Sequence, residues 1–196
     1  INTLEDLSHI GSHNKREKES YKSNPDIRKA DSINNIELVK CNSKYREKFY
    51  EITKEYKKEH DEKMKTIRQD RYKTFDQMVD DSKSCVADEM IFTSGPEFFK
   101  DMSKEEILKW ANGCMDFVYN DLGYTKEQVI QSVLHLDEKT PHIHCVVVPL
   151  VKKFDKRVNK ERYSISKRDY IKDQNYLSIL QDKYCFRLNN LGFKLE

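Results

Sequence analysis

The chain has 196 residues, of which 36% are charged, and it contains only five Gly and four Pro. No apolar run reaches the ~18 residues that a membrane-spanning helix needs, and the five Cys form no CxxC pair, so the sequence indicates neither a membrane protein nor a zinc ribbon or disulfide framework. Length and composition suit one domain, residues 1–196, with long solvated helices and reduced thiols in a cytoplasmic protein.

The first half of the chain predicts one irregular segment and one long helix. Residues 1–42 are charged and are expected to be irregular. Four apolar residues then recur at helical spacing: Tyr45, Phe49, Ile52 and Tyr56. They predict a single helix over residues 43–71 that packs at one end and projects into solvent at the other, with His60 at its surface.

The second half predicts strands and further helices. The expected elements are a strand over residues 84–93, a helix from Ser103 to about Leu122, strands over residues 129–136 and 142–150, a basic stretch over 151–160, a short strand near 163–165 and a helix over 167–190. Ser103 and Glu106 form a capping-box pattern, and Gly192 is placed to end the last helix. This order predicts an α+β fold with a central, mostly antiparallel sheet flanked by long helices.

Three of the six histidines lie within ten residues, between His135 and His144. A polar turn that ends in Pro141 joins the two predicted strands, so this segment is expected to form a β-hairpin. Side chains alternate faces along a strand, and directly paired residues share a face. If His135 pairs with His142 or His144, all three imidazoles point to one side, which predicts a catalytic metal site with open positions.

Charged residues surround this predicted site. Asp137 or Glu138, in the turn, could orient a ligand imidazole or act as a general base. Lys and Arg outnumber Asp and Glu over residues 151–196, whereas acidic residues dominate residues 81–150. A basic stretch beside an acidic, histidine-bearing centre suits a phosphate backbone that passes a metal site, although an ordinary solvated helix face has the same pattern.

At the hairpin the sequence resembles the Mob/Pre plasmid-mobilisation relaxases, a branch of the HUH endonucleases. The matching segments are HLDE at residues 135–138, TPHIH at 140–144, VVVP at 146–149, SHNKRE at 12–17, NIEL at 35–38 and ADE at 87–89. The resemblance therefore runs through the chain in order.

The resemblance implies an enzyme that cuts one DNA strand at an origin of transfer, stays covalently attached to the 5′ phosphate and later rejoins the ends. It implies that His135, His142 and His144 bind Mn²⁺ or Mg²⁺, and imidazole ligands favour Mn²⁺. Because imidazoles must be neutral to bind metal, activity is expected to fall as the pH drops through about 6–6.5.

The same resemblance points to His13 as the nucleophile, since a neutral imidazole is a competent nucleophile at neutral pH. Glu138 would hold or deprotonate the His13 ring, and Arg16 would neutralise the phosphate. The family usually has Tyr where this chain has Ile36, which excludes a tyrosine nucleophile at that position. Tyr21 remains the nearest alternative nucleophile.

The implied partner is transfer-origin DNA in a bacterial cytoplasm, single-stranded or hairpin-shaped near the nick. Phosphate contacts are expected from basic side chains: Lys15, Lys152, Lys153, Lys156, Arg157, Lys160, Arg162, Lys167 and Arg168. The resemblance also implies a short first strand before residue 1 and a helical region after residue 196, through which the protein could dimerise. No membrane contact is expected from residues 1–196.

Three other functions fit the sequence. A rolling-circle replication initiator of the HUH type would nick DNA at a replication origin. A non-enzymatic mobilisation accessory protein would bind DNA and use the histidines only to hold its structure. A hydrolytic metalloenzyme would act on a small substrate, which the basic residues 151–196 disfavour.

Overall fold

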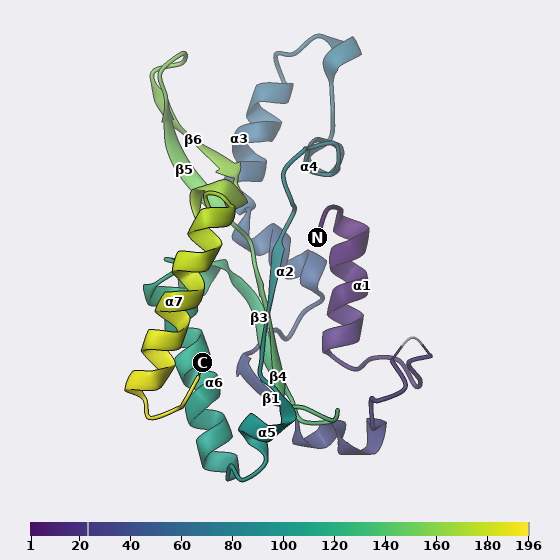
Figure 1. Cartoon of the computed structure of the whole chain (residues 1–196). Coiled ribbons are helices and arrows are strands. Elements are labelled where there is room, and N and C mark those ends of the chain that lie inside the picture. Colours follow the sequence, from purple (N-terminus) through teal and green to yellow (C-terminus); the bar gives the residue numbers. More distant parts are fainter. Residues whose placement is uncertain (23, 196) are drawn as a thin grey trace.

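The computed structural model describes residues 1–22 and 24–195 (Figure 1). Its helices are α1 (Leu4–Asn14), α2 (Tyr45–Ile52), α3 (Lys54–Met64), α4 (Phe75–Asp80), α5 (Pro96–Phe99), α6 (Lys104–Asn120) and α7 (Gln174–Asn190). Its strands are β1 (Ile36–Val39), β2 (Asp88–Thr93), β3 (Val129–His135), β4 (His142–Val147), β5 (Leu150–Asp155) and β6 (Lys160–Ile165).

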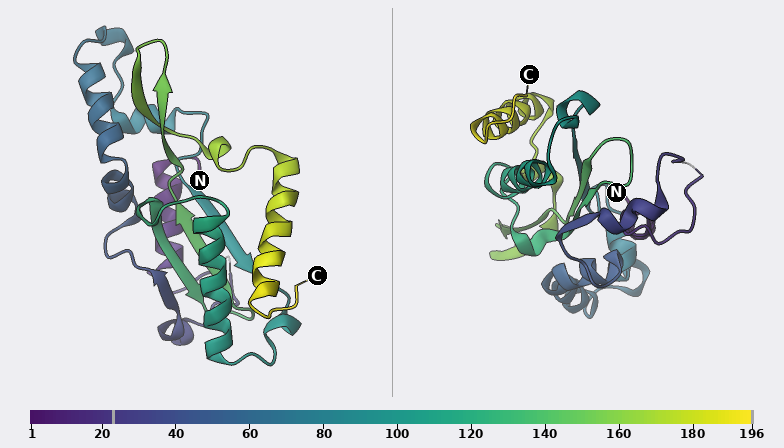
Figure 2. Two further views of the ribbon diagram at one scale, coloured as in Figure 1. Left: turned by 90° about the vertical axis from the view of Figure 1, so that its left-hand side faces the viewer. Right: turned by 90° about the horizontal axis from the view of Figure 1, so that it is seen from below.

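Four strands form the central sheet in the order β1-β3-β4-β2, and each neighbouring pair is antiparallel. In Figure 1, α6 and α7 lie on one side of this sheet, and α1 and α2 lie on the other. β5 and β6 form a separate antiparallel arm that projects beyond the sheet beside α3 (Figure 2). The predicted α+β fold, with its antiparallel sheet, histidine-rich hairpin and flanking helices, is confirmed.

Strand alternation divides the apolar residues of the sheet between two cores. Ile143 and Cys145 of β4 pack with the helices α6 and α7. Val146 and Val148 point the other way and pack with residues of α1 and α2. Each face of the sheet is therefore covered by a helix pair, and the domain has an apolar core on either side of the sheet.

Gly11 allows α1 to lie directly against α2. A Cβ atom at this position would lie 2.8 Å from Cγ of Tyr45, whose side chain is 2% exposed. The Tyr45 hydroxyl in turn donates a hydrogen bond to Gln131 on β3. This close approach fixes where the C-terminal end of α1 lies over the sheet.

Several local predictions are confirmed. Ser103 and Glu106 form the capping box of α6. Gly192 follows the end of α7 with a φ of +93°, a backbone conformation that glycine adopts without strain. The predicted hairpin between the two strands is present, with His135 paired to His142. Among the described residues, no helix is both long and apolar enough to cross a membrane.

The prediction of an irregular N-terminal segment is wrong. α1 occupies most of residues 1–14 and begins with a capping box between Thr3 and Asp6. β1 adds a further strand to one edge of the sheet. The apolar stripe of α1 has helical spacing but is short, since Leu4 and Leu7 are buried and Ile10 is only partly buried, and a polar, charged segment follows it.

The single helix predicted over residues 43–71 is two helices. The buried Thr53 lies between α2 and α3, and its hydroxyl donates to the carbonyl of Phe49. A threonine that bonds back to the preceding turn bends a helix, which accounts for the break. α3 then ends at Met64, so the helical region is shorter than predicted.

The surface position predicted for His60 is also wrong, since its side chain is only 7% exposed. Its Nε2 donates to the carbonyl of Lys73, and its ring packs against Phe75. The chain that follows α3 turns back and covers the histidine, and this tertiary contact has no counterpart in the helical pattern.

Element boundaries in the second half also differ from the predictions. β2 begins at Asp88 rather than at residue 84, and β4 ends at Val147 rather than at residue 150. The basic stretch and the short strand predicted after it together form the β5–β6 arm. The last helix begins at Gln174 instead of residue 167, because the side chain of Asp173 caps it.

Candidate metal centre

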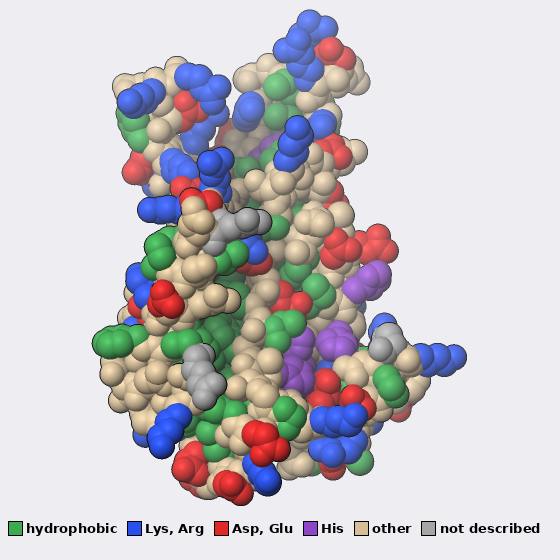
Figure 3. Space-filling view, in the orientation of Figure 1, with side chains coloured by type: hydrophobic (Ala, Val, Ile, Leu, Met, Phe, Trp, Pro, Cys, Tyr) green, Lys and Arg blue, Asp and Glu red, His purple; other side chains and the backbone are tan. Residues whose placement is uncertain are grey.

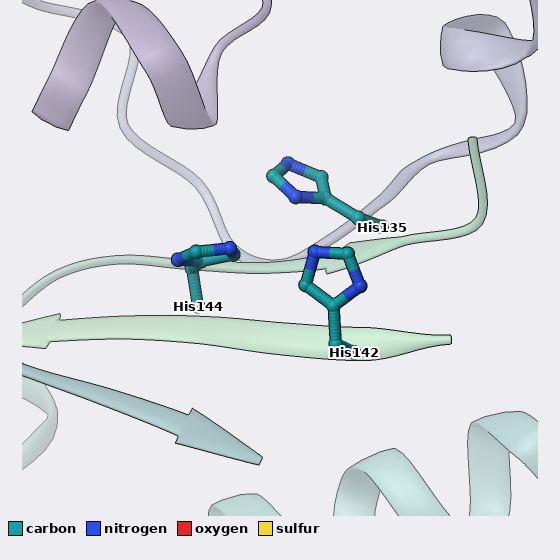
Figure 4. Close-up of side chains that lie close together, drawn as sticks. All are labelled: His135, His142 and His144. Carbon is teal, nitrogen blue, oxygen red and sulfur yellow. The ribbon is translucent and has the colours of Figure 1, made fainter. Parts of the chain in front are cut away.

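The β3–β4 hairpin brings three imidazoles together on one face of the sheet. His135 pairs directly with His142, and His144 lies two residues further along β4 (Figure 4). The ring centroids lie 5.0–5.2 Å from one another. One nitrogen of each ring lies within 4.8 Å of the others, so the three side chains can bind one ion.

The cluster lies where α1 stops covering the sheet. Leu4 and Leu7, in the first half of α1, pack in the core that contains Val146. The helix ends at Asn14, and the residues at its end lie over the part of the sheet that carries the histidines. The end of α1 and the family-like segment of residues 12–17 that begins there therefore lie beside the histidines, and Figure 3 shows histidine side chains gathered on this face of the molecule.

Hydrogen bonds orient all three rings. His135 Nε2 donates to the carbonyl of Asn14 at 2.9 Å, and His142 Nδ1 donates to the carbonyl of Thr140 at 2.9 Å. His144 Nδ1 lies 2.8 Å from a carboxylate oxygen of Glu89 and donates to it. Since these oxygens accept, the opposite nitrogen of each ring keeps its lone pair.

These free lone pairs belong to His135 Nδ1, His142 Nε2 and His144 Nε2. Among the described side chains, His135 Nδ1 is one of few buried polar atoms without a hydrogen-bond partner. A buried nitrogen with an unused lone pair, next to two similar ones, is what a divalent ion requires, so the residues present fit a metal ion. Glu89 and the two carbonyls then fix the ring orientations from outside.

The protonation equilibria favour neutral ligands. Burial, together with the charge of Arg16, lowers the pKa of His135 from 6.5 to about 3. Burial also lowers the pKa of His142. The expected loss of activity through pH 6–6.5 assumed unperturbed imidazoles, and these two lowered pKa values move that expectation to lower pH.

Arg16 forms ion pairs with two acidic residues of the hairpin turn, Asp137 and Glu138. Its Nε and Nη2 donate to the two carboxylate oxygens of Asp137 at 2.8 and 2.9 Å, and Nη2 also donates to Glu138 at 2.6 Å. Asp137 is fully buried and accepts further hydrogen bonds from Ser32 and Asn35. Burial acts to raise the pKa of Asp137, but these donors hold it well below its usual range.

Arg16 contacts both Glu138 and His13, two of the predicted site residues. Glu138 lies 3.5 Å from His142 Nε2 and accepts from Asn24, whereas its bond to the His13 ring, predicted from the sequence, is not among the described contacts. Arg16 Nη1 lies 3.2 Å from His13 Nε2. The His13 ring centroid lies 5.8 Å from that of His144 and 6.5 Å from that of His135.

Tyr21, the alternative nucleophile, packs edge-on against His13 with ring centroids 5.6 Å apart. Its hydroxyl accepts from the backbone N–H of Lys18 and lies 3.5 Å from the carbonyl of Ser12. His13 thus borders the three-histidine cluster, and Tyr21 packs against the His13 ring. The pKa of His13 is lowered by burial and by Arg16, which leaves the ring neutral.

Most of the basic residues predicted to bind DNA lie on or near the β5–β6 arm, away from the histidines (Figures 1 and 3). Many of them are ion-paired: Lys152 with Glu161, Lys153 with Asp169, Arg157 and Arg162 with Asp155, and Lys167 with the buried Asp88. Lys156, Lys160 and Arg168 have no such partner within the described part of the chain. The ammonium of Lys15 donates to the carbonyls of Cys41 and Ser43.

The sequence did not reveal the contribution of three residues. Glu89 binds His144 from the edge strand β2, Asn14 binds His135 through its carbonyl, and Asp137 binds Arg16. Glu89 and Asn14 both lie in segments that resemble the family, which was the available signal. Their contacts cross 55 and 121 residues of sequence, so spacing could not indicate them.

Comparison with known proteins finds relatives that match most of this chain. A plasmid recombination enzyme type 1 from Staphylococcus aureus is 31% identical over 188 residues, which cover 95% of this chain and 40% of the relative. A plasmid recombination enzyme from a Bacillus species is 30% identical over 97% of this chain and 39% of its own length. The chain thus spans about two fifths of these relatives.

Solved structures show the same fold. The Mn-bound MobM relaxase domain in complex with plasmid pMV158 oriT DNA superimposes with a TM-score of 0.72 at 24% identity, over 99% of this chain and 84% of that one. A second Mn-bound crystal structure of that domain with DNA, at pH 4.6, gives a TM-score of 0.71 at 22% identity, over 99% and 85% of the two chains.

The chain has the fold of the MobM relaxase domain, and a histidine cluster lies on the central strands of its antiparallel sheet. The plasmid recombination enzyme model (Mob_Pre) matches residues 2–196. The chain belongs to this family.

Proposed function

We propose that this domain nicks one strand of transfer-origin DNA for plasmid mobilisation, in a bacterial cytoplasm, by metal-assisted transesterification. The observation that carries the proposal is a fourth neutral imidazole, His13, beside three that can bind an ion. A ligand set complete without His13 leaves its ring available for chemistry. Membership of the family and the MobM complexes with oriT DNA support the choice of substrate.

In the proposed reaction, the His13 ring attacks the scissile phosphorus. The new N–P bond forms as the bond from phosphorus to the 3′ oxygen breaks, so the 5′ phosphate remains on the protein. Arg16 binds the phosphate, and its guanidinium is held by Asp137 and Glu138. The reverse attack by a 3′ hydroxyl rejoins the strand.

His135, His142 and His144 would hold the divalent ion, which supplies Lewis-acid withdrawal of charge from the phosphoryl group. Three imidazoles are softer ligands than Mg²⁺ prefers, so we propose Mn²⁺. Glu89 keeps the His144 ring oriented, and the buried Asn14 carbonyl does the same for His135.

DNA outside the nick would contact the basic side chains of the β5–β6 arm. We propose the exposed residues without an ion pair, Lys156, Lys160 and Arg168, as the first phosphate contacts. The paired residues Lys152, Lys153, Arg157 and Arg162 would exchange their carboxylates for phosphate. Lys15 and Lys167 are bound within the fold and are left out of this proposed set.

A covalent-adduct assay tests the proposal. The protein is mixed with Mn²⁺ and single-stranded DNA from the transfer origin beside its own gene, labelled on the 3′ side of the nick. We expect an acid-labile adduct that His13→Ala abolishes. Tyr21→Phe should retain it, as should His9→Ala, which alters an exposed histidine on the same helix.

The other outcomes identify the alternatives. An acid-stable adduct lost with Tyr21→Phe would make Tyr21 the nucleophile of the same reaction. Tight binding without an adduct on either strand would favour a DNA-binding accessory protein. Cleavage only of replication-origin DNA would favour an initiator.

A further inference from the structure

The contact between Arg16 and His13 determines which ring nitrogen of His13 carries the proton. Arg16 Nη1 lies 3.2 Å from His13 Nε2. A guanidinium has five N–H donors and no acceptor. His13 Nε2 must therefore accept with its lone pair, and the proton of the neutral ring resides on Nδ1.

Arg16 cannot easily turn away, because its other donors are fixed. The guanidinium forms a two-point contact with the fully buried Asp137 and a further bond to Glu138. A fork-to-carboxylate pair holds the guanidinium in one plane, unlike a single charge contact. The backbone of Arg16 has a φ of +54°, a left-handed conformation that non-glycine residues seldom adopt.

Asp137 is in turn held from two directions. Ser32 donates to one of its carboxylate oxygens at 2.6 Å, and the side-chain amide of Asn35 donates to the same oxygen at 3.0 Å. These donors come from the segment between α1 and β1, whereas Asp137 belongs to the hairpin that carries the histidines. The orientation of His13 is thus set by a buried carboxylate two residues from His135.

We propose that Asp137 is a positioning residue that acts through Arg16 to select the Nδ1–H form of His13, so that the bond to phosphorus forms at Nε2. The proposal rests on the proposed function, in which His13 is the nucleophile. It assigns the orienting role to Asp137 and Arg16, in place of the direct contact with Glu138 expected from the sequence. A carboxylate that fixes the tautomer of a reactive histidine serves the same purpose in hydrolase triads.

The hydrogen bond from Arg16 to His13 must be replaced before His13 can attack. As the phosphate enters, Arg16 Nη1 moves its hydrogen bond from His13 Nε2 to a phosphate oxygen, which frees the lone pair facing phosphorus. Nε2 bonds to phosphorus as the bond to the 3′ oxygen breaks. The Nδ1 proton passes to water and the 3′ oxygen gains a proton from water, so the step is balanced and leaves a neutral Nε2-phosphorylated ring.

Nuclear magnetic resonance of the protein with ¹⁵N-labelled histidine rings tests the tautomer without metal or DNA. We expect His13, assigned by its loss in His13→Ala, to carry its proton on Nδ1. Asp137→Asn should shift the ring toward the Nε2–H form that free histidine favours. Asp76→Asn, which removes an exposed carboxylate paired with Arg46, should leave the tautomer unchanged.

A second variant guards against loss of the fold in Asp137→Asn. Arg16→Ala removes the guanidinium but leaves Ser32 and Asn35 bonded to Asp137, and it should shift the tautomer in the same direction. Added guanidinium ion, below denaturing concentration, should restore the Nδ1–H form in Arg16→Ala. An Nε2–H ring in the unaltered protein, or an unchanged ring in both variants, would overturn the proposal.

The covalent adduct gives an independent measurement. Alkaline digestion of the adduct made with transfer-origin DNA and Mn²⁺, followed by antibodies that distinguish the two phosphohistidine isomers, should show Nε2-phosphohistidine. Nδ1-phosphohistidine would overturn the proposal even if the DNA is nicked. If no adduct forms while the Nδ1–H form is seen by resonance, the proposed nicking function fails and the tautomer assignment stands.

Kinetics separate positioning from a purely structural role. We expect Asp137→Asn to lower kcat for nicking by up to about 10⁴-fold, the loss that replacing a tautomer-fixing aspartate by asparagine causes in a serine protease. The Kd for the same DNA should stay within about twofold, because Arg16 keeps its charge. Equal losses in kcat and in DNA affinity would indicate a general structural role and contradict the proposal.

Discussion

Glu89 is expected to determine how tightly the three histidines hold a metal ion. Its carboxylate accepts from His144 Nδ1 at 2.8 Å and from the Asn14 side chain at 3.1 Å, and it is 19% exposed. Burial acts to raise the pKa of Glu89, but these two hydrogen bonds lower it, so the carboxylate is charged when the ring binds metal. A charged acceptor makes His144 a stronger ligand and fixes its orientation.

Removal of such an outer partner costs about 10–100-fold in metal affinity, which equals about 1.4–2.8 kcal/mol. We expect Glu89→Ala to reach this range. Glu89→Gln should lose less, because the amide oxygen can still accept from the ring nitrogen but carries no charge. Titration calorimetry with Mn²⁺ on metal-free protein measures both variants.

Glu37→Gln is the matched control, since Glu37 also accepts a side-chain hydrogen bond at the sheet but contacts none of the three histidines among the described residues. Its Mn²⁺ affinity should equal that of the unaltered protein. If Glu89→Ala binds Mn²⁺ within about twofold of the unaltered protein while remaining folded, the ring orientations do not depend on the carboxylate, and the outer-partner argument is refuted.

Three further outcomes are expected. Gly11→Ala should destabilise the domain by up to about 2 kcal/mol in urea unfolding, because overpacking costs about 1–3 kcal/mol and the higher helix propensity of alanine offsets about 1 kcal/mol. Gly95→Ala is the control and should be near neutral, since nothing lies within 4 Å of the added atom. The metal-free protein should lose stability as pH falls from 6.5 toward 3, because His135 binds a proton in the unfolded chain but stays neutral in the native fold. For this group the free energy of unfolding should change by at most about 1.4 kcal/mol per pH unit. A His135→Ala variant with the same slope would contradict the assignment. Lys156→Ala should reduce by about one the slope of log affinity against log salt for transfer-origin DNA. Lys167→Ala, whose ammonium binds a buried carboxylate, should leave that slope unchanged.

The hairpin site was predictable because its geometry is local. The alternation of His142 and His144 along one strand, and a short turn back to His135, suffice to place three rings on one face. The same holds for the capping box at Ser103 and the glycine after α7, which depend only on neighbouring residues.

The unpredicted features depend on contacts between distant segments. α1 is held by the close approach of Gly11 to Tyr45, not by a long apolar stripe. The ion pair of Lys167 with Asp88 spans 79 residues, so no local pattern could indicate it. His60 is buried by a segment that returns after the helix has ended.

The three histidines of the candidate metal centre come from β3 and β4, the two inner strands of the four-stranded sheet. Inner strands exchange their amide hydrogens only when the whole domain opens, whereas helix ends and loops open locally. His13 lies in the last turn of α1, and Arg16 lies just beyond the end of that helix. Under the proposed function, the ion would be held by the least mobile part of the domain, and the nucleophile would stay beside it through the contacts of Arg16 with Asp137 and Glu138.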